Sequence, residues 1–184
     1  MTRTIRNSFS ISMTLLGLVM AMPASAAFSR SGDSRVVFKA TGPAGLSFEG
    51  KSNAVSLKDN GATLVVTVKL DAFATGIELR DRHMKEKYLE TAKYPTASLE
   101  VDKGRLQLPA GSAVSAAVEG KLTLHGVTRP VRVSYRADGD PKNAKVIGSM
   151  HINMKDFKIE VPSYLGVTVK PNVDVDVKMG VVDK

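Results

Sequence analysis

The sequence predicts an all-β protein whose strands form an antiparallel sheet with one buried face. Three observations support this prediction. Apolar and polar residues alternate over several stretches of the 184-residue chain, turn-forming residues separate these stretches, and only one segment has apolar residues at helical spacing. A sandwich and a barrel both fit this pattern, and alternation alone does not choose between them.

The first clear strand pattern covers residues 64–70, where every second residue is Leu or Val. Similar alternation recurs over residues 131–136, 146–155 and 172–179. Because successive side chains of a strand point to opposite faces, each stretch has one apolar and one polar side. The sheet is therefore expected to cover a core with one face and meet water with the other.

Turn signals lie between these stretches. The tripeptide Asp59-Asn60-Gly61 is typical of a hairpin turn. Segments 109–112 and 138–141, which contain Pro and Gly, interrupt the alternation where further hairpins would close. Pro130 is predicted to begin a strand, because its missing N–H is tolerated there.

One segment, beginning near Thr75, is predicted to be helical. Thr75 followed by Glu78 indicates a capping box. The apolar residues that share one helical face are Ile77, Met84 and Tyr88. The residue before Pro95 is pushed out of the helical region, so the pattern predicts three to four turns.

Segments 75–95 and 122–130 together resemble the YceI-like family of secreted lipid- or polyisoprenoid-binding proteins. The resemblance lies in the order of parts: a charged helix, a Tyr-Pro that leads into a strand, the Leu-Thr-Leu-His-Gly-Val-Thr hairpin, Asp156-Phe157 and Tyr164-Leu165-Gly166. It covers nearly all of the chain after residue 26. The resemblance implies an antiparallel lipocalin-like β-barrel of about eight strands, with the short helix packed against one end and room for one small ligand.

The inward-facing apolar residues are the candidate ligand-binding set. They are Val36, Phe38, Leu64, Val66, Val68, Leu99, Val101, Leu122, Leu124, Val131, Val133, Tyr135, Met150, Ile152, Val173, Val175 and Val177. A filled core is the simpler interpretation of such a set. Valines dominate it, however, and the chain has no tryptophan, so slim side chains would leave space inside a barrel. With the resemblance, this favours an interior that holds a ligand.

Three polar residues are candidates for the mouth of the barrel or for contact with a ligand head group: Arg80, His83 and Tyr164. Arg80, Asp81 and His83 match the Arg-Asp-x-His motif of the resembled family. A guanidinium forms bidentate bonds to phosphate and similar oxygens, which favours a head-group role for Arg80. The alternative is structural: these side chains would tie the helix to neighbouring loops.

The sequence predicts no catalytic residue, metal site or cofactor. His83, His125 and His151 have no metal-binding spacing, and the chain has no cysteine and no Gly-x-Ser-x-Gly motif. Asp174 and Asp176 are paired carboxylates, but they fall on the polar side of their strand, where nothing would raise a pKa. They are interpreted as solvated surface.

Residues 1–26 are predicted to be a cleaved signal peptide. Arg3 and Arg6 precede an apolar run that is too short for a membrane span, and Ala24-Ser25-Ala26 fits a cleavage site. Cleavage between Ala26 and Ala27 would leave one domain, residues 27–184, in the periplasm or outside the cell.

Basic residues gather between Lys121 and Lys145, where six of them accompany only two aspartates. On an exported protein this favours transient contact with an anionic membrane surface, or else a solvated exterior that keeps the protein soluble. Nucleic acid is not an expected partner, because no long basic run occurs. The sequence predicts no oligomeric state.

The function expected from these features is non-enzymatic binding of a long apolar lipid, such as a polyisoprenoid or a fatty-acyl chain, for sequestration or transport. A ligand-free stress-response or scaffold protein of the cell envelope is the alternative. A lipid-modifying enzyme would need a buried titratable pair, and the inward-facing set contains none.

Overall fold

The computed structural model describes residues 27–140, 142–164 and 167–183. The predicted signal peptide lies outside the described residues. The strands are β1 Phe28–Thr41, β2 Ser47–Ser52, β3 Val55–Asp59, β4 Thr63–Lys69, β5 Thr96–Asp102, β6 Val114–Leu124, β7 Val127–Asp140, β8 Asn143–Asn153, β9 Ser163–Tyr164, β10 Val167–Thr168 and β11 Asn172–Asp183. Helix α1, Glu78–His83, continues into a π-helical turn, Met84–Tyr88, and short 3₁₀ turns lie at Pro43–Gly45, Lys103–Arg105 and Met154–Phe157.

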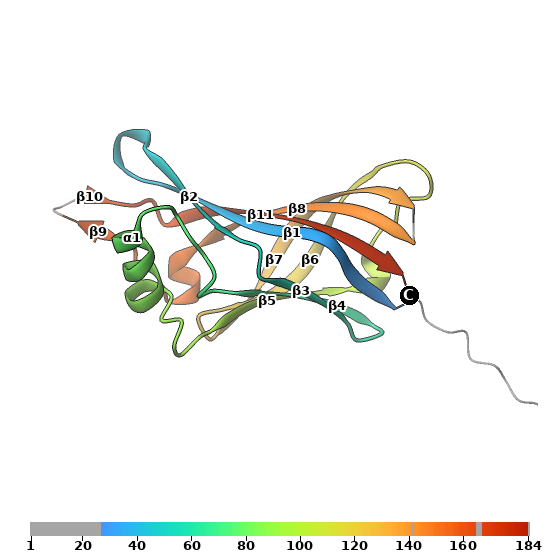
Figure 1. Cartoon of the computed structure of the whole chain (residues 1–184), viewed down its shortest axis with the longest axis horizontal. Coiled ribbons are helices and arrows are strands. Elements are labelled where there is room, and N and C mark those ends of the chain that lie inside the picture. The colour runs from blue at the N-terminus through green and yellow to red at the C-terminus, as the bar shows by residue number, and fades with distance from the viewer. Residues whose placement is uncertain (1–26, 141, 165–166, 184) are drawn as a thin grey trace, which may run out of the picture.

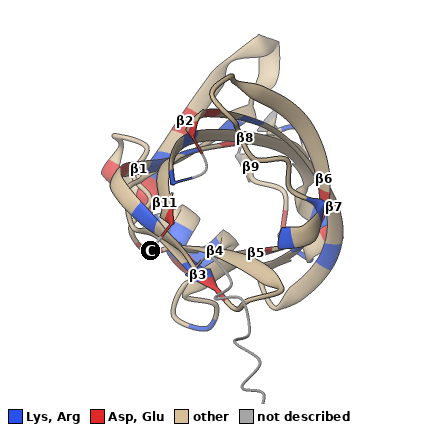
Figure 2. Ribbon diagram, turned by 90° about the vertical axis from the view of Figure 1, so that its right-hand side faces the viewer, with Lys and Arg blue, Asp and Glu red and all other residues tan. Residues whose placement is uncertain are grey.

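Nine of these strands form one antiparallel sheet in the order β2-β1-β11-β8-β7-β6-β5-β4-β3. The sheet curls into a nearly closed barrel, seen from the side in Figure 1 and along its axis in Figure 2. Strands β9 and β10 form a separate small hairpin at the end of the barrel that α1 occupies. The structure therefore confirms the antiparallel barrel with one short helix at an end.

A kink at Asn53 and Ala54 closes the barrel. β2 pairs with β1 at one end of the strand order, and β3 pairs with β4 at the other. Only these two residues separate β2 from β3, and the Ala54 N–H donates to Ser52 Oγ at 3.2 Å. One kinked segment thus supplies both edges of the sheet. The sheet has nine strands rather than about eight because this segment is divided in two.

Two tight turns fix the register of their hairpins. Between β3 and β4, Asp59 Oδ1 accepts the Gly61 N–H at 2.7 Å, and Gly61 has φ +86°. Between β6 and β7, His125 and Gly126 both have positive φ, +52° and +72°, which matches the right-handed twist of the strands they join. Both hairpins lie where the turn residues predicted them.

The prediction that Pro130 begins a strand was wrong, because β7 starts three residues earlier and Pro130 pairs with Lys121 of β6. The proline is tolerated there for a related reason. Pairing of β7 with β8 starts only at Ser134, so the side of β7 opposite β6 has no strand partner at Pro130. The missing N–H therefore costs no hydrogen bond of the sheet.

The predicted capping box was also wrong. The residue before the first turn of α1 is Ile77, and the Thr75 side chain bonds to Asp81 rather than interacting with Glu78. Asp81, one turn into the helix, thus binds Thr75 in the segment that precedes the helix. No helix among the described residues is long and apolar enough to cross a membrane.

Candidate functional site

The interior of the barrel holds a cavity of about 680 Å³ at the end covered by α1. Strand residues form its wall, and the helix and the segment after β8 form its cap. Of the predicted ligand-binding set, the wall contains Val36, Phe38, Val66, Val68, Leu99, Leu122, Leu124, Met150, Ile152, Val173, Val175 and Val177. A large apolar chamber with few polar groups is typical of a ligand pocket.

A smaller chamber of about 140 Å³ lies further along the barrel. Four more predicted residues line it without reaching the large chamber: Leu64, Val101, Val133 and Tyr135. The residues common to both walls are Val66, Leu99, Met150, Val175 and Val177, so these five form the boundary between the chambers. Val131 lines neither chamber and packs against the core from outside them.

Slim side chains leave the large chamber open. Two aromatic side chains of its wall, Phe38 and Phe73, pack against neighbouring residues of the wall. The Phe38 ring lies over Gly50 of the neighbouring strand, where a Cβ would come within 2.1 Å of the ring. Phe73 packs against the same ring, with the centroids 5.4 Å apart. Any side chain larger than glycine at position 50 would displace Phe38, most directly into the chamber.

A loop covers the base of the smaller chamber. The Gln107 N–H donates to Tyr135 Oη at 2.7 Å, and the Tyr135 hydroxyl donates to the Gln107 carbonyl at 3.2 Å. Tyr135 was predicted to face a ligand, but these bonds use its hydroxyl to hold the loop. Phe28 also lines this chamber and is 6% exposed.

At the other end, Thr75 links Arg80 to Asp81. Asp81 accepts hydrogen bonds from the Thr75 N–H and hydroxyl. Arg80 Nε donates to Thr75 Oγ1 at 2.7 Å, and Arg80 Nη2 donates to the Thr75 carbonyl at 2.8 Å. Burial acts to raise the pKa of Asp81, but the hydrogen bonds from Thr75, together with the nearby charges of Lys85 and Arg80, outweigh it and hold that pKa below its usual value.

The polar side chains of the large chamber gather near this arrangement. Thr75, Arg80 and His83 come from the segment that enters and forms α1, and Ser163 comes from β9. His83 is largely exposed at the chamber wall. The structure places Tyr164 in β9, next to Ser163. The predicted mouth residues therefore lie at one end of the barrel.

A largely buried histidine, His125, anchors the chain that follows the helix. His125 Nε2 lies 2.6 Å from Glu90 Oε2, and His125 Nδ1 lies 3.2 Å from the Phe157 carbonyl oxygen. The Tyr94 ring packs on the imidazole at 4.4 Å. Sequence reasoning placed His125 at a hairpin corner but missed these partners, which are 35 and 32 residues away.

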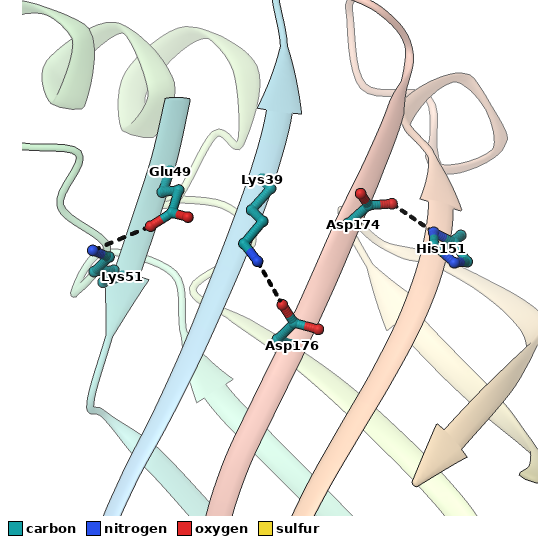
Figure 3. A network of polar contacts seen from close by, with 6 residues as sticks. All are labelled: Lys39, Glu49, Lys51, His151, Asp174 and Asp176. Carbon is teal, nitrogen blue, oxygen red and sulfur yellow. Dashed lines mark hydrogen bonds and ion pairs between the residues drawn. The ribbon is translucent and has the colours of Figure 1, made fainter. Parts of the chain in front are cut away.

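Asp174 and Asp176 lie on the outer face of β11, as predicted. Asp174 pairs with His151 at 2.5 Å, and Asp176 pairs with Lys39 at 3.1 Å (Figure 3). Their side chains are 57% and 41% exposed, so neither lies in a site that excludes water. Within the described ranges, no three His, Cys, Asp or Glu side chains are grouped as a metal ion would require.

Part of the cap over the large chamber gave no signal in the sequence. Its apolar residues Phe73, Leu89 and Ile159 line the chamber but lie in connections that have no period-two alternation. The helical face of Ile77, Met84 and Tyr88 was one signal for the cap, and all three residues line the chamber.

A family model and curated relatives both match this chain. A family model described as a YceI-like domain matches residues 27–181. A UPF0312 protein of Pseudomonas savastanoi pv. phaseolicola is 28% identical over 144 residues, which cover 74% of this chain and 71% of that protein. A UPF0312 protein of Vibrio cholerae is 30% identical over 125 residues, which cover 62% of each chain.

Two solved structures share the fold. A polyisoprenoid-binding domain from Saccharophagus degradans, implicated in plant cell wall breakdown, superposes with a TM-score of 0.72 at 18% identity and covers 86% of this chain and 99% of that one. BcnA of Burkholderia cenocepacia superposes with a TM-score of 0.64 at 19% identity and covers 80% and 95%. At these identities the likeness is evidence for the fold.

Proposed function

Because the chain belongs to the YceI-like domain family, we propose that it binds a long apolar lipid, such as a polyisoprenoid or a fatty-acyl chain, without transforming it. The observation that carries the proposal is the chamber of about 680 Å³ inside the barrel, with its almost wholly apolar wall. The similar domain from Saccharophagus degradans, described as polyisoprenoid-binding, supports the same ligand class.

The driving force is the removal of the lipid chain from water. Burial of each CH₂ group contributes roughly 0.8 kcal/mol, so a few isoprene units offset the several kcal/mol lost on association. An apolar wall distinguishes ligands that differ by one methylene by only about 1–3 kcal/mol. We therefore expect broad tolerance of chain type. Native mass spectrometry of freshly purified protein tests the proposal. Protein that carries no lipid and does not bind lipid probes would favour the alternative, a ligand-free scaffold protein of the cell envelope.

Widening Val175 to phenylalanine should sharply weaken lipid binding while stability stays the same or rises. Val175 lies at the boundary of the two chambers and is only partly buried, although it points into the barrel. The added ring would fill space that the lipid otherwise takes. If that space were already packed, the extra atoms would strain their neighbours by about 1–3 kcal/mol. Fluorescent acyl- or prenyl-probe binding and thermal melting are measured on the same variant.

Two further variants calibrate this result. Val68→Phe adds the same ring at another wall position and should act like Val175→Phe. Val65→Phe adds it three residues earlier in β4, at a position that lines neither chamber, and should leave probe binding unchanged. Intact probe binding with a strongly lowered melting temperature in Val175→Phe would contradict the carrier function.

The proposal includes export to the periplasm and transient contact with an anionic membrane surface. The cleavage pattern before Ala27 supports export, and intact-mass measurement of exported protein should show a chain that begins at Ala27. The exposed Lys121, Lys142 and Lys145 on the barrel surface, and the half-exposed Ile77 and Leu79 at the cap, support membrane contact. Retention of Met1 would contradict export. Equal sedimentation of the protein with neutral and anionic vesicles would contradict contact with an anionic membrane.

A further inference from the structure

The guanidinium of Arg80 is the strongest polar feature of the large chamber. It lies in the chamber wall, 5.1 Å above the centroid of the Phe48 ring. Nε and Nη2 each donate one hydrogen bond to Thr75. A guanidinium has five N–H donors, so three remain, and no acceptor among the described residues takes them.

The charge of Arg80 is also not neutralised by direct contact with a carboxylate. None of the ion pairs within the described ranges contains Arg80. Asp81 is the adjacent acid, but its carboxylate is bound to the N–H and hydroxyl of Thr75. Thr75 thus separates the two charges and fixes the orientation of the guanidinium, which makes Thr75 a positioning residue.

The rest of the wall leaves one place for a charged group. Polar side chains occur only toward the cap, and the opposite end of the chamber is bounded by Val66, Leu99 and Met150. A ligand with an anionic end would leave that end unsolvated anywhere along the apolar wall, which is costly. Its chain would therefore point toward the smaller chamber and its head toward Arg80.

We propose that Arg80 is the recognition site for an anionic oxygen head group, carboxylate or phosphate, on the lipid that enters the chamber. This inference rests on the proposed lipid-binding function. The planar fork of a guanidinium matches two oxygens of either head group, and hydrogen bonds between charged groups are the stronger ones. The protein then prefers acidic lipids over neutral lipids with the same chain.

Matched ligand pairs test this preference at pH 7.5. Dodecanoate is compared with 1-dodecanol, and farnesyl diphosphate with farnesol, each by competition against a fluorescent acyl probe. The wild-type protein should bind at least one anionic member about tenfold or more tightly than its neutral partner, the magnitude expected for a charged hydrogen bond. Which pair shows the larger ratio identifies the carboxylate or the phosphate as the head group.

Arg80→Met removes the charge but keeps an apolar side chain of similar length. It should abolish the preference, so that each anionic ligand binds no more tightly than its neutral partner, and the remaining binding of 1-dodecanol and farnesol shows that the variant is folded. Arg80→Lys keeps the charge but loses the fork and should retain only part of the preference. Arg82→Met is the matched control, because Arg82 is an exposed cation of the same helix that does not line the chamber.

Four outcomes overturn the inference. The wild-type protein could bind both members of each pair equally, Arg80→Met could weaken neutral and anionic ligands alike, or Arg82→Met could act as strongly as Arg80→Met. Equal binding would show that the protein has no preference for acidic lipids. A general loss of binding in Arg80→Met would make Arg80 purely structural, and an equal effect of Arg82→Met would assign the preference to the overall positive charge of the helix. Failure of all four ligands to bind is the fourth outcome, and it overturns the proposed function as well.

Discussion

Replacement of Val133 with aspartate should cost several kcal/mol of stability or prevent folding, whereas aspartate at Ser134 should cost under about 0.5 kcal/mol. Val133 is 8% exposed, lines the smaller chamber and pairs with Val118 of β6. A carboxylate there would lie against the largely apolar wall of the smaller chamber. Ser134 is the next residue of the same strand and points outward.

The comparison depends on a single property of a strand, the alternation of its two faces. Both variants introduce the same residue one position apart in β7, so the introduced side chain and the net charge are matched. Urea denaturation of the two variants measures the difference in unfolding free energy. Equal midpoints would mean that the face assignment is wrong for this strand.

Most of the barrel could be predicted because its determinants are local. Alternation in residues 172–179 identified the inner face of β11, and His125-Gly126 and Asn60-Gly61 lie at the corners of two hairpins. Period two and positive φ depend on neighbours in sequence. The inner wall of the site could be predicted for the same reason.

The rest depends on contacts between distant segments. Nothing in the sequence around Asn53 marks it as the kink at which the chain passes from one edge of the sheet to the other. Thr75 has two possible carboxylate partners, Glu78 and Asp81, and the structure selects the second. The contact of Glu90 with His125 joins residues 35 positions apart, and no periodic pattern indicates it.

Asp59 shows how a turn residue can have a second, larger role. Its place before Asn60-Gly61 predicted only a hairpin. In the structure, Asp59 Oδ2 also accepts the Phe28 N–H at 2.8 Å and lies 2.7 Å from Lys103 Nζ. The side chains of Asp59 and Lys103 are 5% and 16% exposed. One carboxylate therefore joins the start of β1, the β3–β4 turn and the segment after β5.

Asp59→Asn should cost about 3 kcal/mol at pH 7, because the carboxylate accepts hydrogen bonds from the Phe28 N–H and from Lys103, and each hydrogen bond to a charged group contributes about 1.5–3 kcal/mol. The amide keeps the shape of the side chain but has no charge to offer Lys103, and only one oxygen remains for the two backbone N–H groups. Asp138→Asn is the matched control. Asp138 is 64% exposed and lies 3.9 Å from Arg136, so its loss should cost under about 1 kcal/mol.

The pH dependence of this difference identifies its electrostatic origin. Burial acts to raise the pKa of Asp59, but hydrogen bonds from Lys103 and from the N–H groups of Phe28 and Gly61 outweigh it, so that pKa lies below its usual value of 3.8. The folded protein then holds this proton less tightly than the unfolded chain does. The resulting stabilisation is fully present above the unfolded pKa and is lost as the pH falls through the folded one.

Urea denaturation at pH 7, 5, 4 and 3 tests this dependence. The unfolding free energy of the wild-type protein should exceed that of Asp59→Asn by a constant amount down to about pH 5, and the difference should shrink below about pH 4. Asp81, whose pKa is also lowered, is present in both proteins, so its contribution cancels. An advantage as large at pH 3 as at pH 7 would assign the effect to packing instead of to the charge on Asp59.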